Sequence, residues 1–273
     1  MNKENQVMST TTIHPSAVIG ADAKIADGVS IGPFTVIEND VEIGPNTVIG
    51  PNVHIDNGAR IGESCRIFPG AVLSAVPQDL KFEGEETFLY VGDRTVIREC
   101  VTLNRGTKAS GKTVVGSDCL IMAYVHAGHD CIIGNGVIVA NSVQFGGHCE
   151  VDDFAVIGGL AGVHQFVRIG RYAMVGGISR ASLDVPPFVM AGGHEKFRFE
   201  GLNLVGLKRR GFTSQQIDRI RAVYRILFQS GFLLQNALEK VESDCEASPE
   251  RDEILDFFDG GSARRKFIRS YKS

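Results

Sequence analysis

The sequence predicts a parallel β-solenoid of triangular cross-section followed by a small helical domain, and three observations support this prediction. Aliphatic residues recur at every sixth position from Ile13 to Val175, with two interruptions. Glycine is abundant, with 32 residues in a chain of 273. Beyond Pro186 and Pro187 the period of six gives way to apolar residues at helical spacing.

The period of six sets the dimensions of the predicted solenoid. A triangular parallel solenoid has this period because each hexad supplies one short strand and one corner, whereas a helix or a hairpin does not. Three hexads close a coil of eighteen residues, with the aliphatic side chain inside and glycine supplying unusual backbone angles at corners. The aliphatic positions are Ile13, Ile19, Ile25, Ile31, Ile37, Ile43, Ile49, Ile55, Ile61, Ile67, Leu73, Val91, Ile97, Leu103, Val115, Ile121, Ala127, Ile133, Val139, Phe145, Val151, Ile157, Val163, Ile169 and Val175.

Interruptions and the change of period divide the chain. Segments 74–90 and 104–114 break the hexads and are polar, so we expect two loops that project from the prism. Long loops on a rigid scaffold are common places for binding. We predict a polar tail over residues 1–12, a β-solenoid over 13–190 and a helical domain over 191–273.

Three stretches of the C-terminal domain have helical features. Thr213 and Gln216 fit a capping box, and apolar residues follow at helical spacing. Residues 232–241 and 249–258 are predicted as two more helices. A basic tail, expected to be solvated or to meet an acidic partner, contains Arg264, Arg265, Lys266, Arg269 and Lys272.

Composition and charge exclude several classes of protein. The net charge of −4 is unlike that of a general nucleic-acid binder, which is normally basic. No stretch reaches the ~18 consecutive apolar residues of a membrane helix. Residues 1–12 lack the apolar run of a signal peptide, so we expect a cytoplasmic protein. No CxxC pair is present, and free core thiols are expected at Cys65, Cys119, Cys131 and Cys149.

Late in the repeat, histidines gather near an aspartate. They are His126, His129, His148 and His164. Asp130 and His148 are eighteen residues apart, so they should stack on one face about 4.8 Å apart. The position one coil above His129 is Gly147, and glycines here leave room for a ligand to approach the backbone.

Such a cluster suits two chemistries. Histidine can act as the general base that takes a proton from a hydroxyl attacking a thioester, because its pKa of about 6.5 fits neutral pH. Three histidines can instead ligate zinc, as in β-helical carbonic anhydrases. A third interpretation is a non-catalytic scaffold with solvent-facing histidines. The density of the cluster beside an aspartate and glycines favours the general base.

Several segments resemble a known family. Residues 122–134, with His126-Ala127-Gly128-His129-Asp130-Cys131 at their centre, are similar to the active-site segment of bacterial UDP-N-acetylglucosamine acyltransferases, which open lipid A synthesis. Gln78-Asp79-Leu80-Lys81 resembles that family's Gln-Asp-Leu-Lys loop. Residues 147–148, 152–155, 161–166 and 206–212 match as well, and the likeness runs from about Ile13 through the C-terminal helices.

The resemblance implies a fold and an activity. The fold is an all-β left-handed parallel β-helix of hexapeptide repeats followed by a small α-helical C-terminal domain, assembled as a homotrimer. The activity is that of an acyl-[acyl-carrier-protein]–UDP-N-acetylglucosamine O-acyltransferase, which moves an (R)-3-hydroxyacyl chain to the sugar 3-hydroxyl. No metal or other cofactor is implied, because the phosphopantetheine belongs to the acyl carrier protein.

The matching motifs also imply roles for individual residues. His129 would be the general base, Asp130 would orient it and stabilise its imidazolium, and Gly147 would offer a backbone N–H to the oxyanion. The implied substrate-binding residues are Gln78, Asp79 and Lys81 for sugar and diphosphate, His126 and His148 nearby, His164 and Gln165 for acyl chain and pantetheine, Gly177 for the acyl-chain ruler, and Asn203, Arg209 and Arg210 for the nucleotide.

Some alternatives stay open at this point. Val205 stands where the family often has a glutamate, so no nucleotide contact is assigned there. Gly177 implies a deep groove and a longer acyl chain, or is a plain corner glycine. Another hexapeptide acyltransferase using acetyl-CoA or an amino-sugar acceptor, and a β-helical zinc hydratase, are alternatives. Candidate docking residues for an acidic carrier are Arg168, Arg171 and Arg180.

Overall fold

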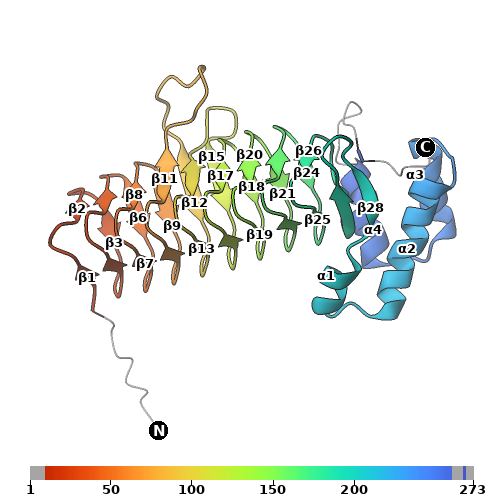
Figure 1. Cartoon of the computed structure of the whole chain (residues 1–273), viewed down its shortest axis with the longest axis horizontal. Helices are drawn as coiled ribbons and strands as arrows, with labels where there is room; N and C mark the ends of the chain where they lie inside the picture. The colour runs from red at the N-terminus through yellow and green to blue at the C-terminus, as the bar shows by residue number, and fades with distance from the viewer. Residues whose placement is uncertain (1–9, 260–266, 269–273) are drawn as a thin grey trace, which may run out of the picture.

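The computed structural model describes residues 10–259 and 267–268, and its strands wind into a long prism with helices at one end (Figure 1). Successive short strands lie on three sheets in turn, one sheet for each face of the prism. The expected tail over residues 1–12 lies largely outside the described residues, as do all five basic residues of the C-terminal tail.

Within the described residues, each sheet takes every third strand of the solenoid. The first sheet contains β1 (Thr12–Ile13), β4 (Ser30–Ile31), β7 (Val48–Ile49), β10 (Arg66–Ile67), β13 (Val96–Ile97), β16 (Leu120–Ile121), β19 (Ile138–Val139), β22 (Val156–Ile157), β25 (Met174–Val175), β27 (Val189–Gly192) and β28 (Arg198–Leu202). The second contains β2 (Val18–Ile19), β5 (Val36–Ile37), β8 (His54–Ile55), β11 (Val72–Ala75), β14 (Thr102–Asn104), β17 (His126–Ala127), β20 (Gln144–Phe145), β23 (Gly162–Val163) and β26 (Arg180–Ala181). The third contains β3 (Lys24–Ile25), β6 (Val41–Ile43), β9 (Ala59–Ile61), β12 (Phe88–Val91), β15 (Lys112–Val115), β18 (Ile132–Ile133), β21 (Glu150–Val151) and β24 (Arg168–Ile169).

Consecutive coils stack in parallel and in register. Ile13 pairs with Ile31 in the first sheet, and Ile19 pairs with Ile37 in the second, so the predicted coil of eighteen residues is confirmed. The aliphatic side chains fill the interior, where Ile55, Leu103 and Ile121 are fully buried. Because the interior accepts an apolar residue from every hexad, burial of these side chains fixes the register.

Glycine follows many of the buried aliphatic residues for a reason that differs from our prediction. A Cβ on Gly20 would lie 2.6 Å from the backbone nitrogen of Asn39 in the next coil, so close stacking excludes a side chain there. Positive φ angles occur instead at separate corner positions, which are often not glycine, such as Tyr124 at 62° and Asp130 at 60°. Each such residue costs about 1–2 kcal/mol of backbone strain, which the surrounding coils must offset.

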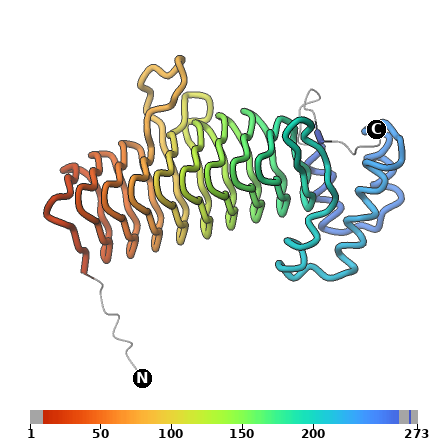
Figure 2. Tube along the Cα trace, viewed as in Figure 1, coloured from red at the N-terminus to blue at the C-terminus, as the bar shows by residue number. Residues whose placement is uncertain are grey.

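Two loops project from the prism at the same corner (Figures 1 and 2). Each connects a strand of the second sheet to one of the third: residues 76–87 link β11 to β12, and residues 105–111 link β14 to β15. Both are shorter than the predicted segments 74–90 and 104–114, because the flanking strands extend into them. The Arg105 N–H donates to the Ala75 carbonyl at 3.1 Å, which joins the bases of the two loops.

Helices cover the far end of the prism (Figure 1). They are α1 (Leu204–Arg209), α2 (Ser214–Gln229), α3 (Leu234–Asp244) and α4 (Pro249–Asp259). The capping box is confirmed at the start of α2, where Thr213 and Gln216 bond each other's backbone N–H groups. The predicted boundary at 190 falls inside β27, and β28 pairs antiparallel with β27, so the sheet continues to Leu202 before the helices begin.

Arginines join the helical domain to the prism. The Arg168 guanidinium donates to the Phe257 carbonyl at 3.1 Å and lies over the Phe257 ring. Arg171 pairs with Asp153 of the prism at 3.4 Å and with Glu253 of α4 at 3.5 Å. Arg168 keeps only 14% of its side chain exposed, whereas Arg171 and Arg180 are exposed and stay candidate docking residues.

Two further expectations concern membranes and thiols. Among the described residues, none of the helices has both the length and the apolar composition needed to cross a membrane. The hexad position of the cysteines predicted core thiols, and those at that position are buried and unpaired: Cys65, Cys119, Cys131 and Cys149.

Candidate active site

The corner between the second and third sheets gathers the candidate catalytic residues. Asp130, His148 and Phe166 occupy equivalent positions in three consecutive coils, eighteen residues apart. All three have positive φ angles, of 60°, 61° and 67°, so their backbones turn the corner in the same way. This stacking brings one carboxylate, one imidazole and one phenyl ring into a column beside the two projecting loops.

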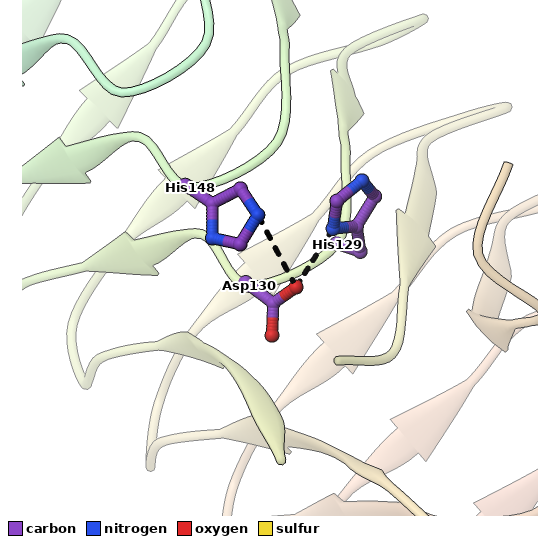
Figure 3. A group of neighbouring side chains, drawn as sticks. All are labelled: His129, Asp130 and His148. Atoms are coloured by element: carbon purple, nitrogen blue, oxygen red, sulfur yellow. Dashed lines mark hydrogen bonds and ion pairs between the residues drawn. The ribbon is translucent and has the colours of Figure 1, made fainter. Parts of the chain in front are cut away.

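The side chains of His129 and Asp130 form a hydrogen-bonded pair at this corner (Figure 3). The Nδ1 atom of His129 lies 2.7 Å from Oδ2 of Asp130. The Asp130 side chain is fully buried, whereas 17% of the His129 side chain is exposed. The imidazole therefore presents its other nitrogen, Nε2, outside this pair, as expected of a general base oriented by a buried carboxylate.

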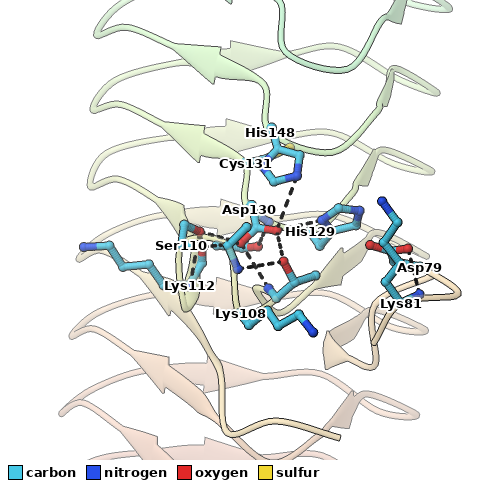
Figure 4. A network of polar contacts seen from close by, with 12 residues as sticks. Asp79, Lys81, Lys108, Ser110, Lys112, His129, Asp130, Cys131 and His148 are labelled. Atoms are coloured by element: carbon cyan, nitrogen blue, oxygen red, sulfur yellow. Dashed lines mark hydrogen bonds and ion pairs between the residues drawn. The ribbon is translucent and has the colours of Figure 1, made fainter. Parts of the chain in front are cut away.

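Donors from the loop over residues 105–111 surround the Asp130 carboxylate (Figure 4). Oδ1 accepts from the Thr107 N–H at 3.0 Å and from the Ser110 hydroxyl, and Oδ2 accepts from the Thr107 hydroxyl at 2.7 Å. Burial by itself raises the pKa of Asp130, but hydrogen bonds from Ser110, Thr107 and His129 outweigh it and lower the pKa to about 2. Asp130 is therefore a carboxylate at neutral pH.

His148 is the second imidazole at the site. Its Nε2 atom lies 3.8 Å from Oδ2 of Asp130, and its ring meets the His129 ring edge-on, with centroids 5.0 Å apart. Phe166 stacks on its other side, with centroids 4.6 Å apart and planes 8° apart. This stacking holds the imidazole above Asp130, one coil from His129.

Gly147 borders the imidazole of His129. A Cβ at this position would lie 2.8 Å from Nε2 of His129, so only glycine leaves space on this face of the ring. Over residues 10–259 and 267–268, no acceptor is found for the Gly147 backbone N–H. An unsatisfied backbone N–H beside an imidazole is the donor type that a tetrahedral oxyanion requires.

The remaining predicted residues of the late coils lie on either side of this cluster. His126, on β17, bonds the Thr102 hydroxyl through Nδ1 at 2.8 Å, and burial lowers its pKa, which favours the neutral ring. His164 and Gln165 follow β23, one coil above Gly146 and Gly147. Gly177 lies between β25 and β26, at the other edge of the second sheet, so a single chain does not bring it to His129.

The predicted sugar-binding residues lie on the loop over residues 76–87. Gln78 and Lys81 are exposed, and the carboxylate of Asp79 accepts from the Lys81 N–H at 3.0 Å (Figure 4). The Glu85 carboxylate accepts from the Lys108 N–H at 3.0 Å, which ties this loop to the one that surrounds Asp130. The two loops therefore share one edge of the site.

The predicted nucleotide-binding residues lie at α1, far along the prism from the histidine cluster (Figure 1). The buried Asn203 caps α1, accepting from the Gly206 N–H at 3.1 Å and donating to the Tyr172 carbonyl. Arg210 lies over the Phe154 ring, 4.5 Å from its centroid, and Arg209 is exposed. Within one chain, these residues do not meet His129.

The cluster also bears on the zinc alternative. His129, Asp130 and His148 could hold a metal ion, since their ligand atoms lie within 4.8 Å of one another. Both oxygens of Asp130, however, already accept hydrogen bonds from Thr107 and Ser110. The set has two histidines and one carboxylate, whereas the zinc alternative predicted three histidines. The donor set fits a carboxylate that orients a base better than it fits a zinc ligand.

Sequence reasoning missed three residues of the site. Thr107 and Ser110 lie in a loop without a period, so no spacing argument could place their hydroxyls against Asp130. Phe166 could have been found, because it lies eighteen residues after His148.

Comparisons with known proteins agree with the fold. A family model described as bacterial transferase hexapeptide (six repeats) matches residues 40–75 and 112–147. A model described as UDP N-acetylglucosamine O-acyltransferase, domain 2, matches residues 184–268. The chain is thus a hexapeptide-repeat transferase with an acyltransferase-type C-terminal domain.

Relatives that match almost the whole chain identify the kind of transferase more closely. The acyl-[acyl-carrier-protein]–UDP-N-acetylglucosamine O-acyltransferase of Chlorobaculum parvum is 72% identical over 96% of this chain and 100% of that protein. The crystal structure of a UDP-N-acetylglucosamine acyltransferase from Bacteroides fragilis matches with a TM-score of 0.92 and 47% identity, over 94% of this chain and 100% of that one. That from Francisella novicida matches with a TM-score of 0.92 and 38% identity, over 96% and 95% of the two chains.

The chain belongs to the acyl-[acyl-carrier-protein]–UDP-N-acetylglucosamine O-acyltransferase family. Its prism is the parallel β-solenoid that the hexads predicted, with the left hand that the resemblance implied.

The position of Gly147 generates a prediction for the substitution Gly147→Ala. The added methyl group would displace the His129 ring, so we expect kcat to fall by about 10²-fold or more, the loss typical of a disturbed oxyanion or base geometry. Steady-state acyl-transfer kinetics would measure it. Gly162→Ala is the matched control, because a Cβ there meets nothing within 4 Å. Full activity in Gly147→Ala would contradict the assignment.

Proposed function

We propose that this chain transfers an (R)-3-hydroxyacyl group from acyl carrier protein to the 3-hydroxyl of UDP-N-acetylglucosamine, with His129 as the general base. The observation that carries the proposal is the His129–Asp130 pair beside the unsatisfied N–H of Gly147. The names of the full-length relatives supply the class of donor and acceptor. The proposed chemistry needs no metal ion or redox cofactor, because the donor brings its own thioester.

The proposed reaction balances with the groups at this corner. Nε2 of His129 takes the proton of the sugar 3-hydroxyl as that oxygen attacks the thioester carbonyl carbon. The negative charge that develops on the carbonyl oxygen meets the N–H of Gly147, and the buried Asp130 stabilises the imidazolium. Collapse of the tetrahedral intermediate breaks the carbon–sulfur bond, and the imidazolium returns the proton to the departing pantetheine thiolate.

The substrate contacts of the proposal follow the positions of exposed polar groups. Gln78, Asp79 and Lys81 on the projecting loop would hold sugar hydroxyls and diphosphate, next to the corner where the base lies. His126 and His148 would contact the sugar, and His164 with Gln165 would line the acyl and pantetheine groove. Arg209 and Arg210 would reach the nucleotide phosphates, since guanidinium groups suit that geometry.

A homotrimer would bring the separated groups together, and we propose this assembly. Gly177 and α1 lie away from His129 in one chain, so a neighbouring copy would have to supply them. Exposed apolar side chains recur at the corner between the first and second sheets, at Tyr124, Leu160 and Ile178, each more than 60% exposed. Such a column of exposed apolar side chains commonly marks an interface.

A cytoplasmic location is proposed on the basis of the substrates.

The assembly predicts a mass in solution of three times the 29.5 kDa of one chain. Ile178→Asp should weaken the trimer, because it buries a charge in an apolar contact. The matched control is Leu233→Asp, at a residue 79% exposed on the helical domain. Light scattering would measure both, and a monomeric wild type would contradict the proposal.

Activity is tested with purified (R)-3-hydroxyacyl carrier protein and UDP-N-acetylglucosamine as substrates. We expect transfer by the wild type and a loss of about 10²–10⁴-fold in kcat/KM for His129→Ala, as for removal of a general base. His54→Ala is the matched control, since His54 also pairs with an aspartate, Asp56, at 2.9 Å but lies in the N-terminal coils.

The same assay separates the alternatives. Transfer from acetyl-CoA at a comparable kcat/KM would favour the alternative of another hexapeptide acyltransferase. Faster transfer to the 3-amino analogue of the sugar nucleotide would favour the amino-sugar acceptor, whose product is an amide. Absence of transfer from hydroxyacyl chains of every length would overturn the proposed function.

A further inference from the structure

The Asp130 carboxylate receives its fixed hydrogen bonds from one loop. Apart from the two histidines, its partners are the Thr107 N–H and hydroxyl, at 3.0 and 2.7 Å, and the N–H and hydroxyl of Ser110. The Ser110 hydroxyl also lies 2.9 Å from the Lys112 carbonyl, but its single proton favours the charged acceptor. This loop over residues 105–111 is an insertion in the solenoid, so these donors are not part of the repeat.

These donors select the orientation of the carboxylate. The terminal torsion of an aspartate is broad and turns easily unless its oxygens are held. Ser110 and the Thr107 N–H hold Oδ1, and the Thr107 hydroxyl holds Oδ2 on the side where His129 Nδ1 lies 2.7 Å away. The carboxylate plane is therefore set before the imidazole becomes charged.

The loop is itself held at several points. The Gly106 N–H donates to the Phe88 carbonyl at 3.1 Å, and the Lys108 N–H donates to Glu85 at 3.0 Å. The Thr107 hydroxyl also accepts from the Ala109 N–H at 3.2 Å, which fixes its rotamer. Thr107 is only 5% exposed, so it acts on the carboxylate and has no surface for a substrate.

We propose that Thr107 and Ser110 are positioning residues for acyl transfer, which hold Asp130 so that Asp130 holds His129. The inference rests on the proposed function, because it assumes that His129 is the base. It adds a third layer to the site: the inserted loop orients the carboxylate, the carboxylate orients the imidazole, and the imidazole meets the acceptor hydroxyl. A misplaced base raises the activation barrier of the chemical step, so it lowers kcat more than it weakens substrate binding.

The test uses full-length Thr107→Val, which keeps the shape and removes the hydroxyl, and Thr107→Ser, which restores a hydroxyl. For Thr107→Val we expect kcat for transfer to UDP-N-acetylglucosamine to fall about tenfold or more, with KM for the sugar nucleotide changed less than about twofold. Thr107→Ser should recover most of the rate. Ser110→Ala, at an exposed residue, should show the same pattern and serves if Thr107→Val does not fold.

The same substitution made in the His129→Ala variant distinguishes a positioning role of Thr107 from a loss of protein stability. In His129→Ala, adding Thr107→Val should change the residual rate by less than about twofold, because the hydroxyl acts through the imidazole. The control Thr95→Val removes a buried hydroxyl that bonds the Gly116 carbonyl at 2.7 Å. It should lower the melting temperature but leave kcat per folded enzyme unchanged.

Two results would overturn the inference alone: full kcat in both Thr107→Val and Ser110→Ala, or an equal loss from Thr107→Val with and without His129. An inactive wild type, or a His129→Ala variant as active as the wild type, would overturn the proposed function and the inference with it.

Discussion

Stacking of one coil on the next is the constraint on which the rest of this protein depends. The interior of the prism accepts an apolar side chain from each hexad, as at Ile55 and Ile121, and a shift of one residue would turn these side chains outward. The close approach of coils also excludes a Cβ at positions such as Gly44, where it would lie 2.6 Å from the Gly62 carbonyl carbon. Register is therefore specified twice, by burial and by backbone packing.

The chemistry depends on this register because it makes distant residues into neighbours. Asp130 and His148 approach each other only because one coil separates them, and Gly147 meets His129 for the same reason. The corner positions supply a rigid left-handed backbone for these side chains. A base built on such a corner keeps its orientation without help from substrate.

The two inserted loops extend the site without disturbing the stack. Both leave the prism at the corner between the second and third sheets, and the strands on either side stay paired, so that Leu73 lies against Leu103 and Leu103 against Ala127. The insertions thus add functional groups that the hexads cannot carry. One brings Asp79 and Lys81, and the other brings the hydroxyl of Thr107 to the buried carboxylate.

Positions that follow the period could be predicted, and positions outside it could not. The count of eighteen placed His148 above Asp130, because parallel stacking leaves one register for a buried aliphatic. The role of glycine was predicted only in part: corner glycines such as Gly28 and Gly136 have positive φ angles, but those that follow the aliphatic residues allow a close backbone approach, which periodicity does not distinguish. Thr107 could not be placed, because loop conformation depends on contacts with Asp130 and Phe88 that no local pattern encodes. The nucleotide role of Asn203 stays a prediction, and the periodicity gave no sign that its buried amide caps α1.

The central claim is that acyl transfer takes place at the corner formed by His129, Asp130 and Gly147. A crystal structure of the protein with the acylated sugar nucleotide tests it most directly. The account predicts the ester oxygen within about 3 Å of His129 Nε2 and the ester carbonyl oxygen facing the Gly147 N–H, at ordinary hydrogen-bond distances. An ester bound at another corner of the prism, with His129 facing solvent, would contradict it.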